Sequence, residues 1–344
     1  MNKITLTIKK LIKPLSIVSI FCFSIMGYAQ DETEFVPKVK TPTTPACILY
    51  SNDYQGQSSI PRSQEILNTM ARGGTGCTTF IVNYNGFTPE AQAAFQFAVD
   101  IWAMSIESSQ PIRVNAFFED LGVGVLGQAG PTSYLTSNAP GAIPNVFYPI
   151  ALWEKLEDAD SNGFGSVDIT ASFSSTFNFY FGTDGNPPGG QHDFVSVVLH
   201  ELGHGLGFAG LASSDGTTGS IRSGGASLPS VYDLTIENGS GESLLDTAIF
   251  TDPSVELHAQ FTSEDLFNNA PISTGQNGGV IPKIFAPSTW NGGSSYSHWD
   301  TNTFPITNEN TLMTPTIGAG QAVHNPGPIT LGLFEDTCAN PSIG

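Results

Sequence analysis

The stretch HELGHGLGF, residues 200–208, carries two histidines four positions apart and a glutamate directly after the first. On a helix, positions i and i+4 lie one turn apart on the same face, so His200 and His204 can bring two imidazoles to one metal ion. Glu201 projects in a neighbouring direction, from which a carboxylate can reach a metal-bound water and take its proton. Zinc suits imidazole ligands, and an open coordination position that holds water marks a catalytic site. The stretch therefore predicts a catalytic zinc site that still needs a third protein ligand.

The helix that carries these residues has recognisable end signals. Asp193 can cap its amino end, so the helix is expected to begin at Phe194. Gly203, Gly205 and Gly207 make a poor helix interior, because each costs about 1 kcal/mol relative to alanine. These glycines predict that the helix ends near residue 207 and that another backbone comes close to it.

The motif resembles the active-site helix of the metzincin metallopeptidases, whose pattern HExxHxxG is followed by a third ligand three residues after the glycine. Gly207 matches the turn glycine of that pattern, but the third-ligand position is Gly210, which has no side chain to bind zinc. A thermolysin-like arrangement is also disfavoured, because residues 216–232 contain no acidic side chain that could serve as the third ligand. The third ligand is therefore sought among the remaining histidines.

His298 is the favoured third ligand. It is followed by Trp299, and Met313 comes later in the sequence LMTP. This order resembles the leishmanolysin branch of the metzincins, in which a large insertion separates the turn glycine from a His-Trp pair and a methionine-containing turn lies beneath the metal. The resemblance implies that His200, His204 and His298 hold one Zn²⁺.

Three other histidines are weaker candidates. His324 is the main rival, because it follows soon after Met313, but the family context is missing around it. His192 precedes the active-site helix and is expected at the surface or beside the ligands. His258 lies in the stretch PSVELHAQF, which has no metal-site pattern around it.

The first part of the chain after residue 76 predicts a β-α-β beginning. Residues 77–87 and 111–122 have the β-branched and aromatic content of strands. Between them, apolar residues recur at helical spacing over residues 89–107, with Thr88 as a possible N-cap and Pro89 at the first helical position.

Further along, strand segments are expected within residues 167–182 and a closing helix over residues 326–338, whereas the Gly- and Pro-rich residues 121–150 are expected to form a loop. The resemblance implies an α+β fold for residues 77–344. This would be a metzincin-like zinc peptidase domain with a twisted mixed sheet packed on two long helices. A long insertion would follow the active-site helix at about residues 211–296.

The amino-terminal residues predict export. Lysines, then an apolar stretch, then small residues give residues 1–29 the order of a secretory signal peptide. The apolar stretch is shorter than the roughly 20 residues of a membrane span, and no later segment is apolar enough to form one. We expect a secreted, extracellular protein, with periplasmic retention left open. Residues 30–76, rich in Pro, Thr, Ser and Gly, are expected to be a leader or linker, or a short pro-segment.

The charge of the chain argues against two classes of partner. The 344 residues carry a net charge of −19, and four of the twelve basic residues lie within the predicted signal. The remainder has 8 basic and 31 acidic residues, a net charge of −23. Nucleic acids and anionic membrane surfaces require a basic footprint, so neither is an expected partner.

Three cysteines follow the predicted signal: Cys47, Cys77 and Cys338. In an oxidising compartment one pair is expected to close as a structural disulfide, although spacing does not reveal which pair. A sharper alternative is that Cys47 caps the metal as a latency device, because a thiolate is a good zinc ligand.

An acidic stretch near residue 160 suggests a site for a second metal ion. Asp158, Asp160, Asn162 and Gly163 match the spacing of a calcium loop, but Ile169 stands where such loops have a glutamate. A solvent-exposed acidic turn is the favoured interpretation, and Ca²⁺ remains the second one.

Taken together, these features predict a secreted zinc-dependent endopeptidase in which Glu201 is the catalytic base. Its substrate, a protein or peptide, would lie extended along an edge strand of the sheet. The main alternative is an exported adhesion or matrix-binding module with a structural zinc site. Glu201 speaks against this alternative, since a structural site needs ligands and no base. Hydrolysis of an ester or glycan linkage is a third possibility.

Overall fold

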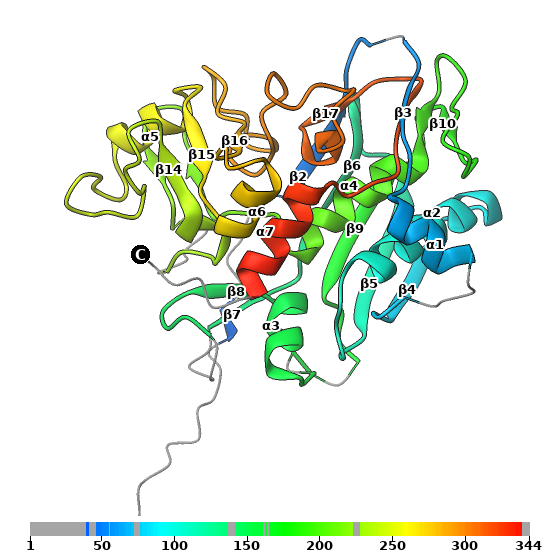
Figure 1. Ribbon diagram of the computed structural model, residues 1–344, viewed down its shortest axis with the longest axis horizontal. Helices are drawn as coiled ribbons and strands as arrows, with labels where there is room; N and C mark the ends of the chain where they lie inside the picture. Colours follow the sequence, from blue (N-terminus) through cyan, green and yellow to red (C-terminus); the bar gives the residue numbers. More distant parts are fainter. Residues whose placement is uncertain are drawn as a thin grey trace, which may run out of the picture. The chain divides into compact units, whose positions relative to one another are not determined.

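The computed structural model describes residues 39–40, 46–54, 56–71, 76–136, 142–160, 162–163, 165–222 and 228–338. All of them belong to one unit, residues 37–344 (Figure 1). The predicted signal peptide, residues 1–29, lies outside the described residues. No helix in the described ranges is both long and apolar enough to cross a membrane.

A mixed six-stranded sheet organises the unit. Strands β4, β5 and β9 run parallel, β6 runs antiparallel to both β9 and β2, and β17 runs parallel to β2. In spatial order the strands are β17 (Thr316–Ile317), β2 (Cys47–Ser51), β6 (Val125–Pro131), β9 (Ile169–Ser174), β5 (Ile112–Glu119) and β4 (Phe80–Asn85). The mixed sheet and the helices described next confirm the expected α+β class and the expected strands β4, β5 and β9.

Two long helices pack together beside the sheet. Helix α2 (Pro89–Ser105) begins where predicted, because the side chain of Thr88 accepts a hydrogen bond from the Ala91 backbone N–H. Helix α4 (Phe194–Leu206) is buried along its whole length and contacts β6, β9 and β2 (Figure 1). Its N-cap is Asp193, as predicted, and the carboxylate accepts hydrogen bonds from the Ser196 N–H and hydroxyl.

The two helices and the sheet meet at an aromatic core. The rings of Phe95 from α2, Phe173 from β9 and Phe194 from α4 are all fully buried and meet edge to face, at centroid separations of 5.5 Å for both Phe95–Phe173 and Phe173–Phe194. Edge-to-face packing is the geometry that the aromatic quadrupole favours. This core fixes the start of α4 against the sheet.

The prediction of a loop over residues 121–150 is wrong. This range contains β6, β7 (Tyr134–Thr136) and β8 (Phe147–Pro149), and β6 is a central strand of the sheet. Its glycines suggested a loop, but Gly127 has a packing role. A Cβ atom there would lie 2.9 Å from Cγ of Glu201 and 3.1 Å from Cγ1 of Val197. Glycine lets α4 lie close against this strand.

Residues 30–76 were expected to be a leader or linker, yet their described parts are built into the unit. They include β1 (Val39–Lys40), β2, β3 (Ser58–Ile60) and α1 (Gln64–Ala71). Strand β3 pairs in parallel with β18 (Gln321–Val323), near the other end of the chain. These strands draw their partners from distant segments, so a local sequence pattern gives little sign of them.

The expected insertion follows α4 and is drawn in yellow to orange in Figure 1. Within it, β14 (Ile236–Asn238), β15 (Leu266–Asn268) and β16 (Lys283–Ile284) form a small antiparallel sheet. The other described elements of the insertion are β12 (Ser213–Ser214), β13 (Gly219–Ser220), η1 (Tyr232–Thr235), α5 (Val255–Phe261) and α6 (Pro271–Gln276).

The closing helix predicted over residues 326–338 is confirmed as α7 (Pro328–Cys338), which packs on α6. Helix α3 (Ile150–Glu157) follows β8, and a short parallel pair, β10 (Phe179–Tyr180) with β11 (His192–Asp193), leads into α4. The chain therefore reaches the site helix directly from a paired strand.

Candidate metal centre

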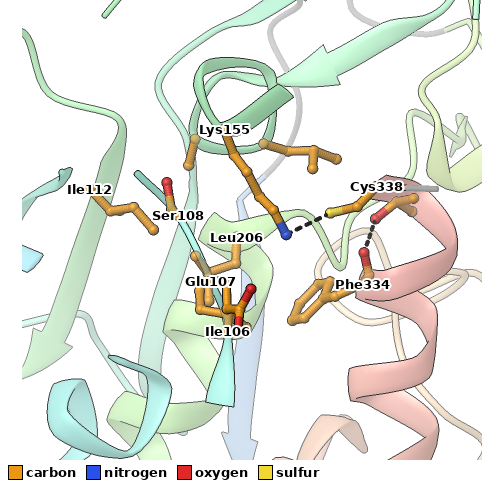
Figure 2. A pocket seen from close by; sticks show the side chains of 11 residues that line it. Ile106, Glu107, Ser108, Ile112, Lys155, Leu206, Phe334 and Cys338 are labelled. Carbon is orange, nitrogen blue, oxygen red and sulfur yellow. Dashed lines mark hydrogen bonds between the residues drawn. The ribbon is translucent and has the colours of Figure 1, made fainter. Parts of the chain in front are cut away.

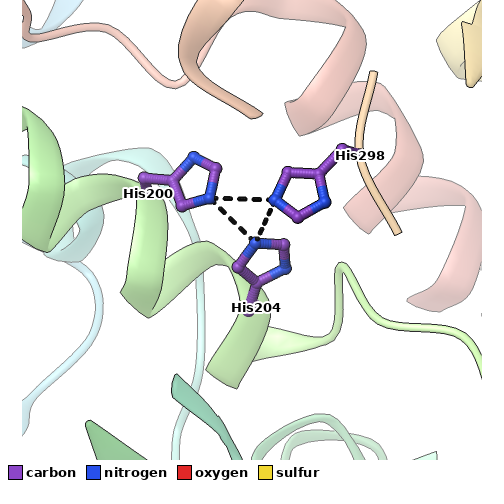
Figure 3. A group of neighbouring side chains, drawn as sticks. All are labelled: His200, His204 and His298. Atoms are coloured by element: carbon purple, nitrogen blue, oxygen red, sulfur yellow. Dashed lines mark hydrogen bonds between the residues drawn. The ribbon is translucent and has the colours of Figure 1, made fainter. Parts of the chain in front are cut away.

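Three histidines converge on one point. His200 and His204 come from α4, and His298 follows the insertion, as predicted. Their Nε2 atoms face one another at 2.9 Å for His200–His204 and 3.2 Å for each of the other two pairs (Figure 3). Among the described residues, this is the one group of three or more His, Cys, Asp or Glu side chains whose ligand atoms could hold a metal ion.

The opposite nitrogen of each ring identifies the tautomer. Nδ1 of His200 lies 2.6 Å from the Leu312 carbonyl oxygen. Nδ1 of His204 lies 2.7 Å from the Phe208 carbonyl oxygen, and Nδ1 of His298 lies 2.7 Å from the Ser294 carbonyl oxygen. A carbonyl oxygen only accepts, so each Nδ1 must carry the proton and donate it. Each Nε2 is then a bare lone pair. Such outer hydrogen bonds also hold the rings of metal-binding histidines in orientation.

Burial keeps the three rings neutral. All three side chains are almost fully buried. Burial lowers the pKa of His200 to about 4, and it lowers the pKa values of His204 and His298 well below their ordinary range, with neighbouring imidazoles adding to the effect. Three converging lone pairs without a proton repel one another, and a cation at their centre would relieve this repulsion.

The glycines of α4 admit side chains from elsewhere in the fold. A Cβ atom at Gly203 would lie 2.7 Å from Sδ of Met313, and one at Gly205 would collide with the side chain of Ile169. We expected another backbone to approach here, so that prediction is corrected: side chains fill these gaps. The helix ends where predicted, at Gly207, whose φ of 130° is open to glycine and strained for other residues.

The segment around Met313 contacts both parts of the chain that carry the three histidines. Met313 is fully buried in the short helix η2 (Thr311–Met313), and its carbonyl oxygen accepts a hydrogen bond from the Trp299 N–H at 2.9 Å. The preceding carbonyl, that of Leu312, is the acceptor for His200. One turn therefore holds the residue after His298 and orients His200, a second candidate ligand.

Glu201 lies on α4 directly after the first ligand, fully buried. Its Oε1 accepts a hydrogen bond from the Leu49 N–H of β2 at 3.1 Å, while Oε2 has no hydrogen-bond partner in the described part of the chain. Burial raises the pKa of this carboxyl well above its usual value, and hydrogen bonds from the backbone of Leu49 and Ala129 act in the opposite direction. A buried carboxylate oxygen without a partner is held ready for a proton donor.

Gly210 stands where the metzincin pattern has its third ligand, and here it has another role. The Gly210 N–H donates a hydrogen bond to the Ser297 hydroxyl at 3.0 Å, one residue before His298. A Cβ at Gly210 would collide with Tyr296 and Asp233. Glycine at this position thus allows the returning chain to deliver His298 to the site.

The remaining histidines lie outside the cluster. His324, the predicted rival, places Nε2 2.8 Å from Oδ2 of Asp193 and so contributes to the cap of α4. His258 contacts the hydroxyl of Ser214. His192 was expected at the surface or beside the ligands, but it is buried on β11 with its ring edge-on to Phe177. On this strand it pairs with Phe179 of β10.

The expected disulfide is absent, because Cys47, Cys77 and Cys338 are all free thiols. Cys338 ends α7, and its Sγ lies 3.1 Å from Nζ of Lys155, at the edge of a small apolar pocket lined mainly by α3, α7 and the residues that follow α2 (Figure 2). Cys47 begins β2, and burial raises the pKa of its thiol to about 12, with Glu201 adding to the shift. Cys77 lies in the bend before β4, so the three cysteines are in separate parts of the chain.

The acidic stretch near residue 160 is partly internal. Asp158 is the C-cap of α3 and accepts hydrogen bonds from the side chains of Ser109 and Gln110. Asn162 donates to the buried Asp168, whose carboxylate also accepts from the Arg113 N–H. Asp160 accepts from the Gly165 N–H. The favoured interpretation of an exposed turn therefore holds only for part of the stretch, and Ca²⁺ binding here stays a hypothesis.

Sequence reasoning missed two contributors to the site. The backbone carbonyls of Leu312, Phe208 and Ser294 orient the ligands, and no sequence signal marks them because every residue has a carbonyl. The second is β2, whose Leu49 N–H contacts Glu201. Its five residues, CILYS, do not alternate between apolar and polar side chains, and a stretch this short cannot be separated from a leader by inspection.

Comparison with known proteins adds similarity over part of this region. A family model described as SPBPB7E8-like matches residues 89–216, which run from the start of α2 past α4. The uncharacterized protein PB7E8.01 of Schizosaccharomyces pombe is 31% identical over 83 residues, 24% of this chain and 14% of that protein. No solved structure matches significantly. The family-model match includes His200, Glu201 and His204 and ends before His298.

Proposed function

We propose that this chain is an exported zinc-dependent endopeptidase with a metzincin-like catalytic domain. The observation that carries the proposal is the convergence of three bare Nε2 atoms in a buried, uncharged setting. Zinc binds imidazole nitrogen at about 2.0–2.1 Å, so tetrahedral ligands stand about 3.3–3.4 Å apart. The separations of 2.9–3.2 Å are close to that spacing. An all-imidazole ligand set also suits zinc better than calcium or magnesium.

Three protein ligands leave one coordination position open, which is the arrangement of catalytic zinc sites. Zinc bound here would supply Lewis acidity, polarising a substrate carbonyl and making water acidic enough to be deprotonated near neutral pH.

Glu201 is the residue that handles the proton. Its carboxylate takes a proton from the attacking water and returns it to the nitrogen of the departing amine. Water thereby adds across the peptide bond, with hydroxyl on the carbonyl carbon and hydrogen on the amine. The lack of a hydrogen-bond partner at Oε2 among the described residues supports this role, since that oxygen is free to receive the proton.

The surrounding elements support the resemblance stated from sequence. The distant His298, Trp299 beside it and Met313 all come together with α4, although they are far apart along the chain. The predicted signal at residues 1–29 supports export, and the acidic chain fits a protein or peptide substrate rather than nucleic acid.

The decisive experiment separates zinc binding from catalysis. We expect Glu201→Gln to keep about one zinc per chain, because the three ligands are unchanged, and to lose peptide cleavage by at least about a hundredfold, because the proton carrier is gone. Zinc is measured by elemental analysis after dialysis, and cleavage on a quenched-fluorescent peptide library. Glu119→Gln, at the end of β5, is the matched control and should retain both properties.

Two results would contradict the proposal. Cleavage unchanged in Glu201→Gln would remove the base from the mechanism. A zinc-loaded parent that cleaves no peptide of the library would favour a structural zinc site in an adhesion or matrix-binding module.

A further inference from the structure

One turn of the insertion, residues 230–233, lies between the end of α4 and the segment that leads to the third histidine. The turn runs into the short helix η1. Asp233 is fully buried, and its carboxylate accepts hydrogen bonds from the Leu211 N–H at 3.1 Å and from the N–H and hydroxyl of Ser230 at 2.7 and 2.8 Å. Leu211 follows shortly after α4, so Asp233 ties this turn to the end of the helix that carries the first two histidines.

The residue before Asp233 reaches the other segment. The Tyr232 hydroxyl donates a hydrogen bond to the carbonyl oxygen of Tyr296 at 2.9 Å, and both side chains are buried. Tyr296 lies two residues before His298 in the chain. Within the described part of the chain, its carbonyl accepts no other hydrogen bond. Two adjacent residues of one turn therefore contact the segments on both sides of the candidate metal centre.

Tyr296 has a backbone conformation that is unusual for an aromatic residue. Its φ of 76° lies in the left-handed region, which glycine adopts easily and which costs free energy for a residue with a side chain. Such a conformation persists only where the surrounding contacts hold it. The other non-glycine residues of the described ranges with positive φ are Asn145, Asp158 and Glu264.

Three segments of the insertion hold Tyr296 in this conformation. Its N–H donates to the Phe285 carbonyl at 2.7 Å, and its ring meets that of Phe261 edge to face at 5.5 Å. The Tyr232 hydroxyl holds the carbonyl. The ring also fills the space beside Gly210, where an added Cβ would lie 2.3 Å from its Cε1. The N–H, the ring and the carbonyl of this one residue are thus each fixed by a different contact.

We propose that Tyr232 and Asp233 are positioning residues of the candidate metal centre. Together they join the end of α4 to the strained residue that precedes His298, and so hold the third imidazole where it meets His200 and His204 (Figure 3). The inference rests on the zinc site of the proposed function and adds to it the residues that set the affinity for the ion. Neither residue is a ligand.

Loss of the Tyr232 hydroxyl would release the strained residue. The backbone of Tyr296 would then leave the left-handed region in part of the molecules and move His298 away from the other two rings. An ion binds only the fraction of molecules in which all three imidazoles converge, so the apparent dissociation constant rises in inverse proportion to that fraction. The hydroxyl therefore acts on metal affinity through the place of one ligand.

The first test measures zinc affinity in the full-length chain, by competition with a chromophoric chelator. We expect Tyr232→Phe to raise the dissociation constant for zinc about tenfold, as a converged fraction of about one tenth requires. Tyr84→Phe is the matched control and should leave the constant unchanged. It also removes a tyrosine hydroxyl that donates a hydrogen bond, to Gln96, but on the outer strand β4.

Asp233 is tested in the same assay. In Asp233→Asn a single acceptor oxygen replaces two, for the donors on Leu211 and Ser230. We expect this change also to raise the dissociation constant for zinc about tenfold. Asp168→Asn, which alters another buried carboxylate with backbone and side-chain donors, is the control and should bind zinc as the parent does.

A second substitution tests the strain itself. Glycine adopts the left-handed region without the cost, so in a Tyr296→Gly chain the Tyr232 hydroxyl has no strain left to oppose. We therefore expect Tyr232→Phe to raise the dissociation constant about tenfold in the natural chain and by less than about twofold in the Tyr296→Gly chain. A general loss of packing at Tyr232 would give the same ratio in both chains and would overturn the inference.

Cobalt in place of zinc reports the ligand geometry directly. The visible absorption of protein-bound Co²⁺ weakens when water replaces an imidazole and the coordination number rises. We expect Tyr232→Phe to absorb more weakly than the parent and Tyr84→Phe at equal cobalt content. If Tyr296→Gly does not fold, this spectrum still decides the matter, because an unchanged spectrum in Tyr232→Phe would show that His298 has not moved.

The outcomes separate this inference from the proposed function. Variants with the expected loss of affinity in a parent that holds zinc yet hydrolyses no peptide would leave Tyr232 and Asp233 in their assigned role and remove the peptidase. A parent that hydrolyses peptides, with equal zinc affinity in Tyr232→Phe and Asp233→Asn, would keep the peptidase and remove the positioning residues. A parent that binds no zinc would overturn both.

Discussion

The indole N–H of Trp102 donates a hydrogen bond to the carbonyl oxygen of Leu199, 3.0 Å away and out of contact with solvent. Trp102 lies on α2, and Leu199 directly precedes His200 on α4. The bond therefore joins the two long helices at the turn that carries the first candidate ligand.

Loss of this hydrogen bond should lower the free energy of unfolding by a measurable amount. We expect Trp102→Phe to lower the free energy of unfolding by about 1 kcal/mol more than Trp153→Phe does. Both indoles are buried, but Nε1 of Trp153 has no hydrogen-bond partner among the described residues, so its replacement removes no such bond. Urea unfolding followed by circular dichroism gives both values, and equal losses would show that the bond contributes nothing.

The third ligand is tested by zinc content. We expect His298→Ala to lose its zinc on dialysis, because two imidazoles alone do not retain the ion, whereas His324→Ala and His192→Ala should keep about one zinc per chain. The two controls are buried histidines with other contacts. Full zinc retention in His298→Ala, measured by elemental analysis, would refute the assignment.

The packing of α4 on the sheet is tested at a glycine. Replacement of a helix glycine by alanine normally stabilises a helix by about 1 kcal/mol. At Gly205 the added methyl would collide with Ile169, so we expect Gly205→Ala to destabilise the fold by about 1–3 kcal/mol instead. Gly275→Ala in α6 meets no atom within 4 Å and is the control, expected to be neutral or stabilising. A thermal scan that finds Gly205→Ala as stable as the parent would contradict this packing.

Asp168 should make stability depend on pH between about 4 and 6. Burial raises its pKa from 3.8 to about 6, with the charge of Glu154 adding to the shift. Because the folded state favours the protonated form, the contribution of Asp168 is full below pH 4 and is lost as pH rises through 6. A two-unit shift corresponds to at most about 3 kcal/mol.

Asp168→Asn removes this titration. The variant should be less stable than the parent near pH 4, because the amide has one acceptor for the two hydrogen bonds from Arg113 and Asn162. The deficit should shrink or reverse by pH 7. Asp120→Asn, at an exposed turn, provides the reference profile. A constant difference between Asp168→Asn and the parent across this range would show that the carboxyl does not titrate as described.

The parts of the fold that could be predicted from sequence are those with local signals. Thr88 and Pro89 mark the start of α2, while Asp193 and Gly207 mark the two ends of α4, and all four lie where expected. The cluster of His200, His204 and His298 was also predictable, although for His298 the family resemblance was needed in addition to spacing.

The parts that were missed depend on distant contacts. Strand β6 looked like a loop because Gly127 is required by Glu201, which approaches from another part of the chain. Strand β2 looked like a leader because its partners, β6 and β17, follow it by long stretches of sequence. His192 was expected at the surface or beside the ligands, because no residue near it in the sequence indicates that Phe177 covers its ring.

The hydrogen bond between Gly210 and Ser297 joins residues 87 positions apart, at the two ends of the insertion. The bond fastens these two ends beside the candidate centre. Residues inside the insertion hold the returning chain as well, because the Phe285 N–H donates to the His298 carbonyl at 2.8 Å and α6 packs on α7. The insertion is therefore part of the scaffold of the site, and a chain in which a short loop replaces it should fail to bring His298 to the other two histidines.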